Sequence, residues 1–417
     1  MSLLRKKIEQ EIRERGPIPF SRYMELCLYD SELGYYSRNA EQFGKAGDFY
    51  TSSDVHAVFG CLLARQFDEM WRALGSPDNI ELVELGPGRG LFAQDVFAWS
   101  EKKFPDFFDA LRYVLIESSA ALRARINDTL KLHLDSGKVV FRTLEFLAAA
   151  PFPAAKRRQN AAHGASRGYG EGEEQAPEGR KKSSLESASG VPTIVFANEF
   201  FDALPVEILS AKGSLRINTR DNRFVEIWVH PSPDELEFLD RYSVHPDSDE
   251  RVEVPLAAQR YIHRVAADIQ HGFFVAIDYG YTREEQLSGR HRGTLKALRQ
   301  HSLSANPYEA PGEQDITADV NFTALAAAAE KHGMQTQKLI TQSQFLMGIG
   351  ESNQFADAFE DCRLPQERAK VALQLKHLVT PAGMGESFHV LVAGKGIEPE
   401  KVAALAGLNF GRMARPM

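Results

Sequence analysis

An acidic residue followed by three alternating glycines carries the first chemical signal in this chain. Residues 83–90 read Val-Glu-Leu-Gly-Pro-Gly-Arg-Gly, which places Glu84 ahead of Gly86, Gly88 and Gly90. Because glycine accepts positive φ angles and has no side chain, such a turn lets a ligand lie against the bare backbone. A carboxylate beside the turn disfavours a pyrophosphate and suits a ligand that carries an ammonium group.

Two common nucleotide-binding motifs do not fit this turn. The dinucleotide fingerprint would place a third glycine at the position of Leu91, and no Gly-Lys-Ser/Thr string follows as in a P-loop. Glu117, at the end of the next expected strand, could accept both hydroxyls of a ribose whose 2′-OH is free. S-adenosylmethionine has an ammonium group and such a ribose, while NAD remains possible on these residues alone.

Short apolar runs predict the strands that position these residues. Continuous apolar runs are typical of strands buried on both faces of a parallel sheet. They occur at residues 80–85, 113–116, 139–141, 193–196 and 273–277, and two last strands are expected at 338–340 and 387–392. Helical periodicity at 119–132 and 255–269 indicates the α/β class, and a helical N-terminal layer is expected before the first strand.

Two segments depart from this pattern. Residues 154–190 are rich in Gly, Ser, Ala, Glu, Lys and Arg, and we predict a disordered insertion because they cannot bury enough apolar surface to offset the entropy of ordering. Residues 206–229 alternate apolar and polar side chains around Lys212-Gly213 and Asp221-Asn222, which predicts a hairpin.

Composition narrows the class of protein. The 417 residues include 49 Lys or Arg and 57 Asp or Glu, for a net charge of −8, with no basic stripe that would suit nucleic acid. Three distant cysteines give no zinc pattern, so no metal is expected, and no apolar run predicts a membrane span. The first residues lack the apolar segment of a secretory signal and contain acids that are unusual in a transit peptide, so we expect a bacterial-type cytoplasmic protein.

Several strings that are rare in proteins follow one another along the chain. They are Gly16-Pro17-Ile18, Leu33-Gly34-Tyr35-Tyr36, Gly47-Asp48-Phe49-Tyr50-Thr51-Ser52, the glycine turn, Asn198-Glu199-Phe200-Phe201-Asp202-Ala203-Leu204-Pro205, Asp315-Ile316-Thr317-Ala318-Asp319-Val320 and Met384-Gly385-Glu386. In these strings the chain resembles the MidA-type methyltransferases, which include a mitochondrial assembly factor that methylates an arginine on a complex I subunit. The resemblance extends from about Gly16 to Gly394.

This resemblance implies a fold, a cofactor and a partner. The fold is the Rossmann-like class I methyltransferase fold, in which a seven-stranded, mostly parallel sheet ends in an antiparallel strand. The cofactor is S-adenosylmethionine, and the partner is a protein substrate bearing an arginine, such as a complex I subunit; a homodimer is also possible. The implied parts are a helical region with a cofactor lid (1–75), a core (76–394) with substrate-side insertions at 205–270 and 282–320, and a tail (395–417).

The resemblance also implies site residues at matching positions. Glu84, Gly86, Pro87, Gly88 and Gly90 would line the methionine half of the cofactor. Glu117, with Ser118 beside it, would hold the ribose, and Thr143 and Leu144 would flank the adenine. A lid over the cofactor would be formed by Gly47, Asp48, Phe49, Thr51 and Ser52.

Residues after the fourth expected strand are the candidates for catalysis. A guanidinium arrives protonated, and a carboxylate can clamp its N–H groups, direct one nitrogen at the methyl group and accept a proton. Glu199 is the first candidate and Asp202 the second, while Asn198 could orient the attacking nitrogen and contact the cofactor. Glu199 could instead be an acid at a helix N-terminus, and Phe200 and Phe201 could be ordinary core residues.

Other interpretations stay open from the sequence. The enzyme could methylate another nitrogen or oxygen nucleophile, or the chain could be a non-catalytic assembly scaffold that retains the cofactor fold. Residues 278–281 either border the substrate channel or form a turn after the fifth strand. We expect His291 and His301, with the arginines near them, to be solvated surface, because their separation lacks metal-ligand spacing.

Overall fold

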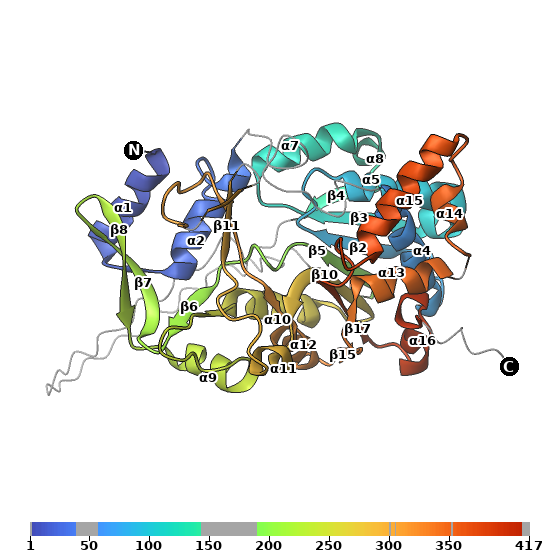
Figure 1. Cartoon of the computed structure of the whole chain (residues 1–417). Coiled ribbons are helices and arrows are strands. Elements are labelled where there is room, and N and C mark those ends of the chain that lie inside the picture. The colour runs from blue at the N-terminus through green and yellow to red at the C-terminus, as the bar shows by residue number, and fades with distance from the viewer. Residues whose placement is uncertain are drawn as a thin grey trace, which may run out of the picture.

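The computed structural model describes residues 2–38, 57–142, 190–299, 302–304, 306–351 and 353–410. Within these residues the chain forms three β-sheets, with nine, five and three strands. Figure 1 shows the largest sheet between layers of helices, with α1 and β8 at one end of the molecule and α14 and α16 at the other. The predicted α/β class is therefore confirmed.

The main sheet has the strand order β15-β17-β10-β5-β2-β3-β4, with β14 beside β10 and β16 beside β17. Strands β2, β3, β4, β5 and β10 are mutually parallel, whereas β17 runs antiparallel to β10. The bounds are β2 (Ile80–Leu85), β3 (Leu111–Ile116), β4 (Val139–Arg142), β5 (Thr193–Asn198), β10 (Gly272–Tyr281), β14 (Val320–Asn321), β15 (Gln335–Thr336), β16 (Ile340–Thr341) and β17 (Phe388–Lys395). The mostly parallel sheet with an antiparallel last strand is thus present.

The strand expected at 338–340 is the weakest match. The chain there pairs with β17 in two pieces, β15 and β16, and only Ile340 of the expected strand lies in either piece. Between them the N–H of Gln337 still donates to the carbonyl of Val392 at 2.8 Å. This part of the sheet edge is therefore irregular.

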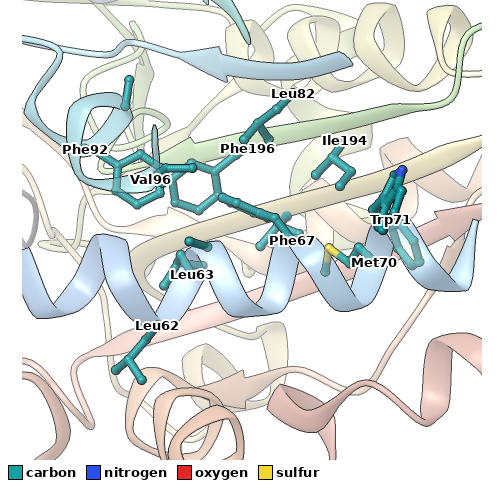
Figure 2. Packing of buried hydrophobic residues seen from close by; sticks show 14 of the residues in the cluster. Leu62, Leu63, Phe67, Met70, Trp71, Leu82, Phe92, Val96, Ile194 and Phe196 are labelled. Atoms are coloured by element: carbon teal, nitrogen blue, oxygen red, sulfur yellow. The ribbon is translucent and has the colours of Figure 1, made fainter. Parts of the chain in front are cut away.

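Helices cover both faces of the main sheet. On one face α4 (Ala57–Ala73) and α5 (Leu91–Lys103) pack against β2 and β5, and the ring of Phe196 stacks on Phe92 with 4.7 Å between centroids (Figure 2). Phe67 of α4 meets the same ring edge-on. On the other face α10 (Leu256–Asp268) and α12 (Phe322–Glu330) cover a second core. Strands buried on both faces explain the continuous apolar runs in the sequence.

The remaining helices are shorter or lie at the periphery. Their bounds are α6 (Pro105–Ala110), α7 (Ala120–Thr129), α8 (Lys131–Asp135), α9 (Pro233–Tyr242), α11 (Arg283–Leu287), α13 (Gln342–Glu351), α14 (Ala356–Phe359), α15 (Pro365–Val379) and α16 (Pro399–Ala403), with 3₁₀ turns η1 (Tyr35–Ser37) and η2 (Ala406–Leu408). No helix in the described part of the chain is long and apolar enough to cross a membrane.

A five-stranded sheet stands apart from the main sheet. It has the order β1-β7-β6-β9, with β8 paired to β7, and its strands are β1 (Ile18–Pro19), β6 (Glu207–Ser210), β7 (Gly213–Arg220), β8 (Arg223–Val229) and β9 (Val252–Val254). The predicted hairpin is confirmed, since Asp221 and Asn222 join β7 and β8 with φ angles of 49° and 55°, as a two-residue hairpin turn requires.

The N-terminal helices belong to this smaller sheet. Helices α1 (Leu3–Arg15) and α2 (Phe20–Tyr29) share a core with β6 and β7, whereas α4 lies on the main sheet. The single helical layer expected before the first strand is therefore divided between two cores, because β1 pairs with β7 and carries α2 with it. Nearly all of the predicted insertion at 154–190 lies outside the described residues.

A three-stranded sheet completes the described fold. Strands β11 (Lys296–Arg299), β12 (Ser302–Ser304) and β13 (Asp315–Thr317) were not expected from the sequence, because each is short and only partly apolar. The carbonyl of Asp202 accepts a 2.9 Å hydrogen bond from the N–H of Ala318, which fixes this sheet against the turn that follows β5.

Candidate functional site

A cavity of about 800 Å³ opens where β2, β3, β5 and β10 end. Carboxyl ends of parallel strands meet at one edge of a sheet, so the turns that follow them surround one space. Nine of the residues proposed from the sequence line it among the described residues: Glu84, Gly86, Pro87, Gly88, Glu117, Ser118, Asn198, Glu199 and Asp202. Seven others, namely Gly47, Asp48, Phe49, Thr51, Ser52, Thr143 and Leu144, lie outside the described residues.

The glycine turn between β2 and α5 forms one wall of the cavity. Gly86, Gly88 and Gly90 have φ angles of 66°, 55° and 77°, in the left-handed region that favours glycine. A Cβ atom on Gly86 would collide with the ring of Phe200, which lines the cavity beside the turn. The ring of Phe200 therefore packs directly against the backbone of the turn.

Gly90 has a different position from the one expected. It does not line the cavity but precedes α5, where a Cβ atom would lie 3.3 Å from Leu130 and 3.4 Å from Ile126. The third glycine therefore allows α5 to begin close to α7. In the Rossmann-like turn the last glycine also allows close packing of the helix. The spacing of the glycines does not show which of them contacts the ligand and which serves packing.

Glu84 is a buried carboxyl group on the cavity wall. It is 5% exposed, and Tyr113 Oη donates a 2.9 Å hydrogen bond to its Oε2. Burial raises the pKa of Glu84 to about 8, and the Tyr113 hydrogen bond offsets only part of this effect. A cation that enters the cavity would favour the ionised form, so this residue suits an ammonium group.

Glu117 lies directly after β3, the strand that pairs with β2, and lines the same cavity. Its Oε1 accepts a 2.7 Å hydrogen bond from the N–H of Ser119, and Ser119 Oγ donates to the carbonyl of Tyr36 at 2.7 Å. Burial raises the pKa of Glu117 to about 7. The 3₁₀ turn η1 is thereby fixed beside a carboxyl group that can accept hydroxyl donors such as those of a ribose.

The turn after β5 presents the three proposed catalytic residues. Asn198 Nδ2 donates to Glu199 Oε1 at 3.2 Å, and Asn198 Oδ1 is buried without a hydrogen-bond partner among the described residues. Glu199 has a φ angle of 49°, which is rare for a residue with a side chain. No helix begins here within the described residues, so the interpretation of Glu199 as a helix N-terminal acid is wrong.

Asp202 is the more deeply buried of the two carboxylates in this turn. It is 6% exposed, and Tyr279 Oη donates a hydrogen bond to its Oδ2. Burial raises the pKa of Asp202 to about 6, against the effect of the Tyr279 hydrogen bond. The two phenylalanines of the turn differ, since Phe201 is core at 3% exposure whereas Phe200 lines the cavity.

Aromatic residues from the N-terminal part of the chain also reach the cavity. Tyr29 Oη donates to the carbonyl of Ala203 at 2.9 Å, and Tyr36 Oη donates to Asp315 Oδ1 at 3.0 Å. The two tyrosine rings lie 5.5 Å apart. Sequence reasoning assigned no role to these residues, although Tyr36 and Asp315 both belong to strings that carried the resemblance.

His291 is not solvated surface as expected from its spacing. It lines the cavity, stacks on Tyr281 with 5.2 Å between ring centroids and lies 3.1 Å from Asp319 Oδ2 through Nδ1. Lys296 Nζ donates to the other oxygen of Asp319 at 2.9 Å. The expectation was wrong because these contacts depend on the three-stranded sheet, while His301 lies outside the described residues.

The segment at 278–281 continues a strand and is not a turn. All four residues belong to β10, and Tyr279 and Gly280 line the cavity, as expected for a border of a substrate channel.

Among the described lining residues carboxyl groups outnumber Lys and Arg by eight to three. The acids are Glu84, Glu117, Glu199, Asp202, Glu285, Asp315, Asp319 and Glu386, and the bases are Arg89, Arg290 and Lys296.

Comparisons with known proteins identify the family to which the chain is similar. A sequence model of a family described as putative S-adenosyl-L-methionine-dependent methyltransferase matches residues 62–340. The Drosophila melanogaster protein arginine methyltransferase NDUFAF7 homolog, mitochondrial, is 28% identical over 415 residues, covering 94% of this chain and 85% of that protein. The Homo sapiens protein arginine methyltransferase NDUFAF7, mitochondrial, is 25% identical over 402 residues, covering 91% and 80%.

Solved structures share the fold. A Burkholderia thailandensis protein bound to S-adenosyl-homocysteine has a TM-score of 0.72 and 24% identity, covering 97% of this chain and 94% of that chain. A native crystal structure of an uncharacterized protein from the same organism has a TM-score of 0.71 and 25% identity, covering 98% and 94%. The class I fold predicted from the sequence is therefore confirmed.

Proposed function

The chain belongs to a family of S-adenosyl-L-methionine-dependent methyltransferases, and on this premise we propose that it methylates an arginine side chain of a protein. The predicted cofactor, S-adenosylmethionine, is confirmed by the family. The residues of the cavity fit it: Glu84 suits its ammonium group, Glu117 suits its ribose hydroxyls, and Gly86 and Gly88 form part of the cavity wall without side chains.

The main support for arginine as the substrate is that two carboxylates, Glu199 and Asp202, line the cavity. Both carboxylates come from one turn, line the same cavity as the glycine turn and are joined to it through Phe200, which packs on Gly86. A guanidinium offers several N–H groups in one plane, which two carboxylates can accept at once. The excess of carboxyl groups in the lining favours entry of a cation.

These residues can also perform the proton step of the reaction. Bound S-adenosylmethionine supplies an electrophilic methyl group on a sulfonium. A nitrogen of the guanidinium forms the new bond to the methyl carbon, the carbon–sulfur bond breaks with its electron pair going to sulfur, and one N–H proton must leave. Glu199 would orient the guanidinium, and Asp202, whose pKa is raised to about 6, would accept that proton.

The experiment that tests the proposal identifies the methylated amino acid. The full chain is incubated with tritiated S-adenosylmethionine and a protein extract from host cells that lack it, and labelled proteins are hydrolysed. Label on methylarginine would support the proposal. Label on another amino acid would overturn the arginine assignment, and no label from a protein that binds S-adenosyl-homocysteine would favour the scaffold.

The resemblance supports a respiratory complex I subunit as the protein substrate, and the names of the curated relatives support arginine as the residue. Mass spectrometry of labelled bands from the same experiment would identify the subunit. The expected cytoplasmic location and the homodimer stay predictions, which cell fractionation and light scattering would test.

A further inference from the structure

Asp278 binds three consecutive backbone N–H groups of the turn that carries the proposed catalytic residues. Its Oδ2 accepts from the N–H groups of Phe200 at 3.2 Å, Phe201 at 3.0 Å and Asp202 at 3.4 Å. Its Oδ1 accepts from the N–H of Tyr279 at 3.0 Å. The side chain is fully buried and does not line the cavity, so it acts on a ligand through the residues that it holds, namely the turn and Tyr279.

The backbone of the turn explains why one acceptor can serve three donors. Glu199 has a left-handed conformation, and a left-handed residue beside right-handed ones makes successive N–H groups converge on one side of the chain. Without Asp278 these buried N–H groups would lose their acceptor. Strand β10 is parallel to β5, with Ile277 opposite Asn198, so the residue after Ile277 lies beside the point where β5 ends.

A charged carboxylate at position 278 is electrostatically unfavourable for the folded state. Asp202 and Glu199 both repel a charge on Asp278, and burial together with this repulsion raises the pKa of Asp278. Yet all four hydrogen-bond partners of its carboxyl group are N–H donors, which an ionised carboxylate satisfies best. Asp278 therefore holds in place the turn that carries two other acids, Glu199 and Asp202.

We propose that Asp278 is a positioning residue for methyl transfer, which holds Asn198, Glu199 and Asp202 toward the methyl group of the cofactor. The inference rests on the proposed function, because it requires that this turn face the methyl group. Asparagine at 278 would offer one oxygen to the three N–H groups but would turn its NH₂ group toward the N–H of Tyr279. Alanine would offer no acceptor.

Two cofactor analogues test the inference without knowledge of the protein substrate. Sinefungin carries an amine where S-adenosylmethionine carries its methyl group, and S-adenosyl-homocysteine carries nothing there. In the wild type, carboxylates held at that position should favour sinefungin by about tenfold, the effect of one charge-assisted hydrogen bond. Calorimetry on the full chain measures both affinities.

The preference for sinefungin over S-adenosyl-homocysteine should decrease from wild type to Asp278→Asn and further to Asp278→Ala. Asp278→Asn should reduce it, and Asp278→Ala should bring the two affinities within about twofold, while affinity for S-adenosyl-homocysteine stays within about threefold of wild type. With an arginine-bearing substrate in hand, kcat should fall in the same order with little change in KM for S-adenosylmethionine. A normal affinity for S-adenosyl-homocysteine also shows that each variant is folded; if Asp278→Ala is not, Asp278→Asn decides.

Glu235→Gln is the matched control. Glu235 is another buried carboxylate, at 2% exposure, which accepts from Ser214 Oγ and the N–H of Ser232 and does not line the cavity. This variant should keep the full preference for sinefungin. Preference retained in Asp278→Asn and Asp278→Ala, or absent from a wild type that binds S-adenosyl-homocysteine, would overturn the inference. A wild type that binds neither analogue would overturn the proposed function itself.

Discussion

A Cβ atom added to Gly86 would lie 2.8 Å from Cδ2 of Phe200, a distance that real Cβ contacts essentially never show. One residue belongs to the turn proposed to bind the cofactor, and the other to the turn proposed to bind the substrate. Their contact joins the two halves of the site, so that a side chain added at Gly86 must displace the ring of Phe200.

Gly86→Ala should therefore weaken cofactor binding as well as stability. The φ angle of 66° alone costs a residue with a side chain about 1–3 kcal/mol, and the ring of Phe200 must also move. Calorimetry with S-adenosyl-homocysteine and urea unfolding measure the two effects. Gly137→Ala is the control, because its φ angle is 75° with nothing within 4 Å of a Cβ atom, so it should lose stability and keep its affinity. Equal affinity in the Gly86 variant would contradict the position of the site.

The two buried glutamates should contribute to different parts of the ligand. Glu84→Gln should weaken S-adenosyl-homocysteine binding by about tenfold to a hundredfold, the effect of a hydrogen bond to a charged group, and leave adenosine binding unchanged. Glu117→Gln should weaken both ligands, because both contain the ribose. Competition calorimetry at pH 8.5 measures all four affinities. An exchange of these two patterns between the variants would reverse the assignment.

The unfolding free energy of the ligand-free protein should fall as pH rises from 5 to 8. Burial raises the pKa of Glu84 to about 8 and that of Glu117 to about 7, so over this range the folded state holds protons that the unfolded state has released. Each group contributes stability that is complete below its unfolded pKa and is lost as pH passes its folded pKa. Glu84→Gln should make the fall shallower by up to about 1.4 kcal/mol per pH unit. Urea unfolding at pH 5.5, 7 and 8.5 checks this, and identical slopes would refute it.

Glu199→Gln should abolish most turnover while the cofactor still binds. Loss of a group that orients the nucleophile costs about 10²-fold in rate, whereas affinity for S-adenosyl-homocysteine should stay within about threefold. Label transfer to host proteins and calorimetry measure the two quantities, with Glu235→Gln as a control that should behave as wild type. Unchanged turnover would remove Glu199 from the mechanism.

Tyr279→Phe should move the acidic limb of the turnover profile to higher pH. The phenol donates a hydrogen bond to Asp202 and thereby lowers the pKa of that carboxyl group, which burial raises to about 6. Other groups that face Asp202 are Asp278 on β10, Tyr29 on α2 and Asp319 beyond β13, and all of them remain in the variant. Initial rates between pH 5 and 8 test the shift; a limb that stays in place would exclude Asp202 as the proton acceptor.

Local patterns were sufficient for the buried parallel strands of the main sheet and for the glycine turn. The apolar runs at β2 and β5 predict buried strands because both faces of the sheet are covered. The glycines at 86 and 88 predict a turn because glycine readily adopts the positive φ angles that this turn has. Residue type alone does not give the role of Gly90. This glycine allows close packing against Leu130 and does not line the cavity.

What the amino-acid sequence by itself determined is the class of fold, the positions of the main strands along the chain and the turn residues that follow them, because these depend on neighbours along the chain. Only the tertiary structure decided which distant residues complete the cavity. Tyr36 donates to Asp315 across 279 positions of sequence, and His291 meets Asp319 only once β11 and β13 have paired. Such contacts depend on the relative placement of segments that are distant in the sequence, which arises when their apolar faces pack together.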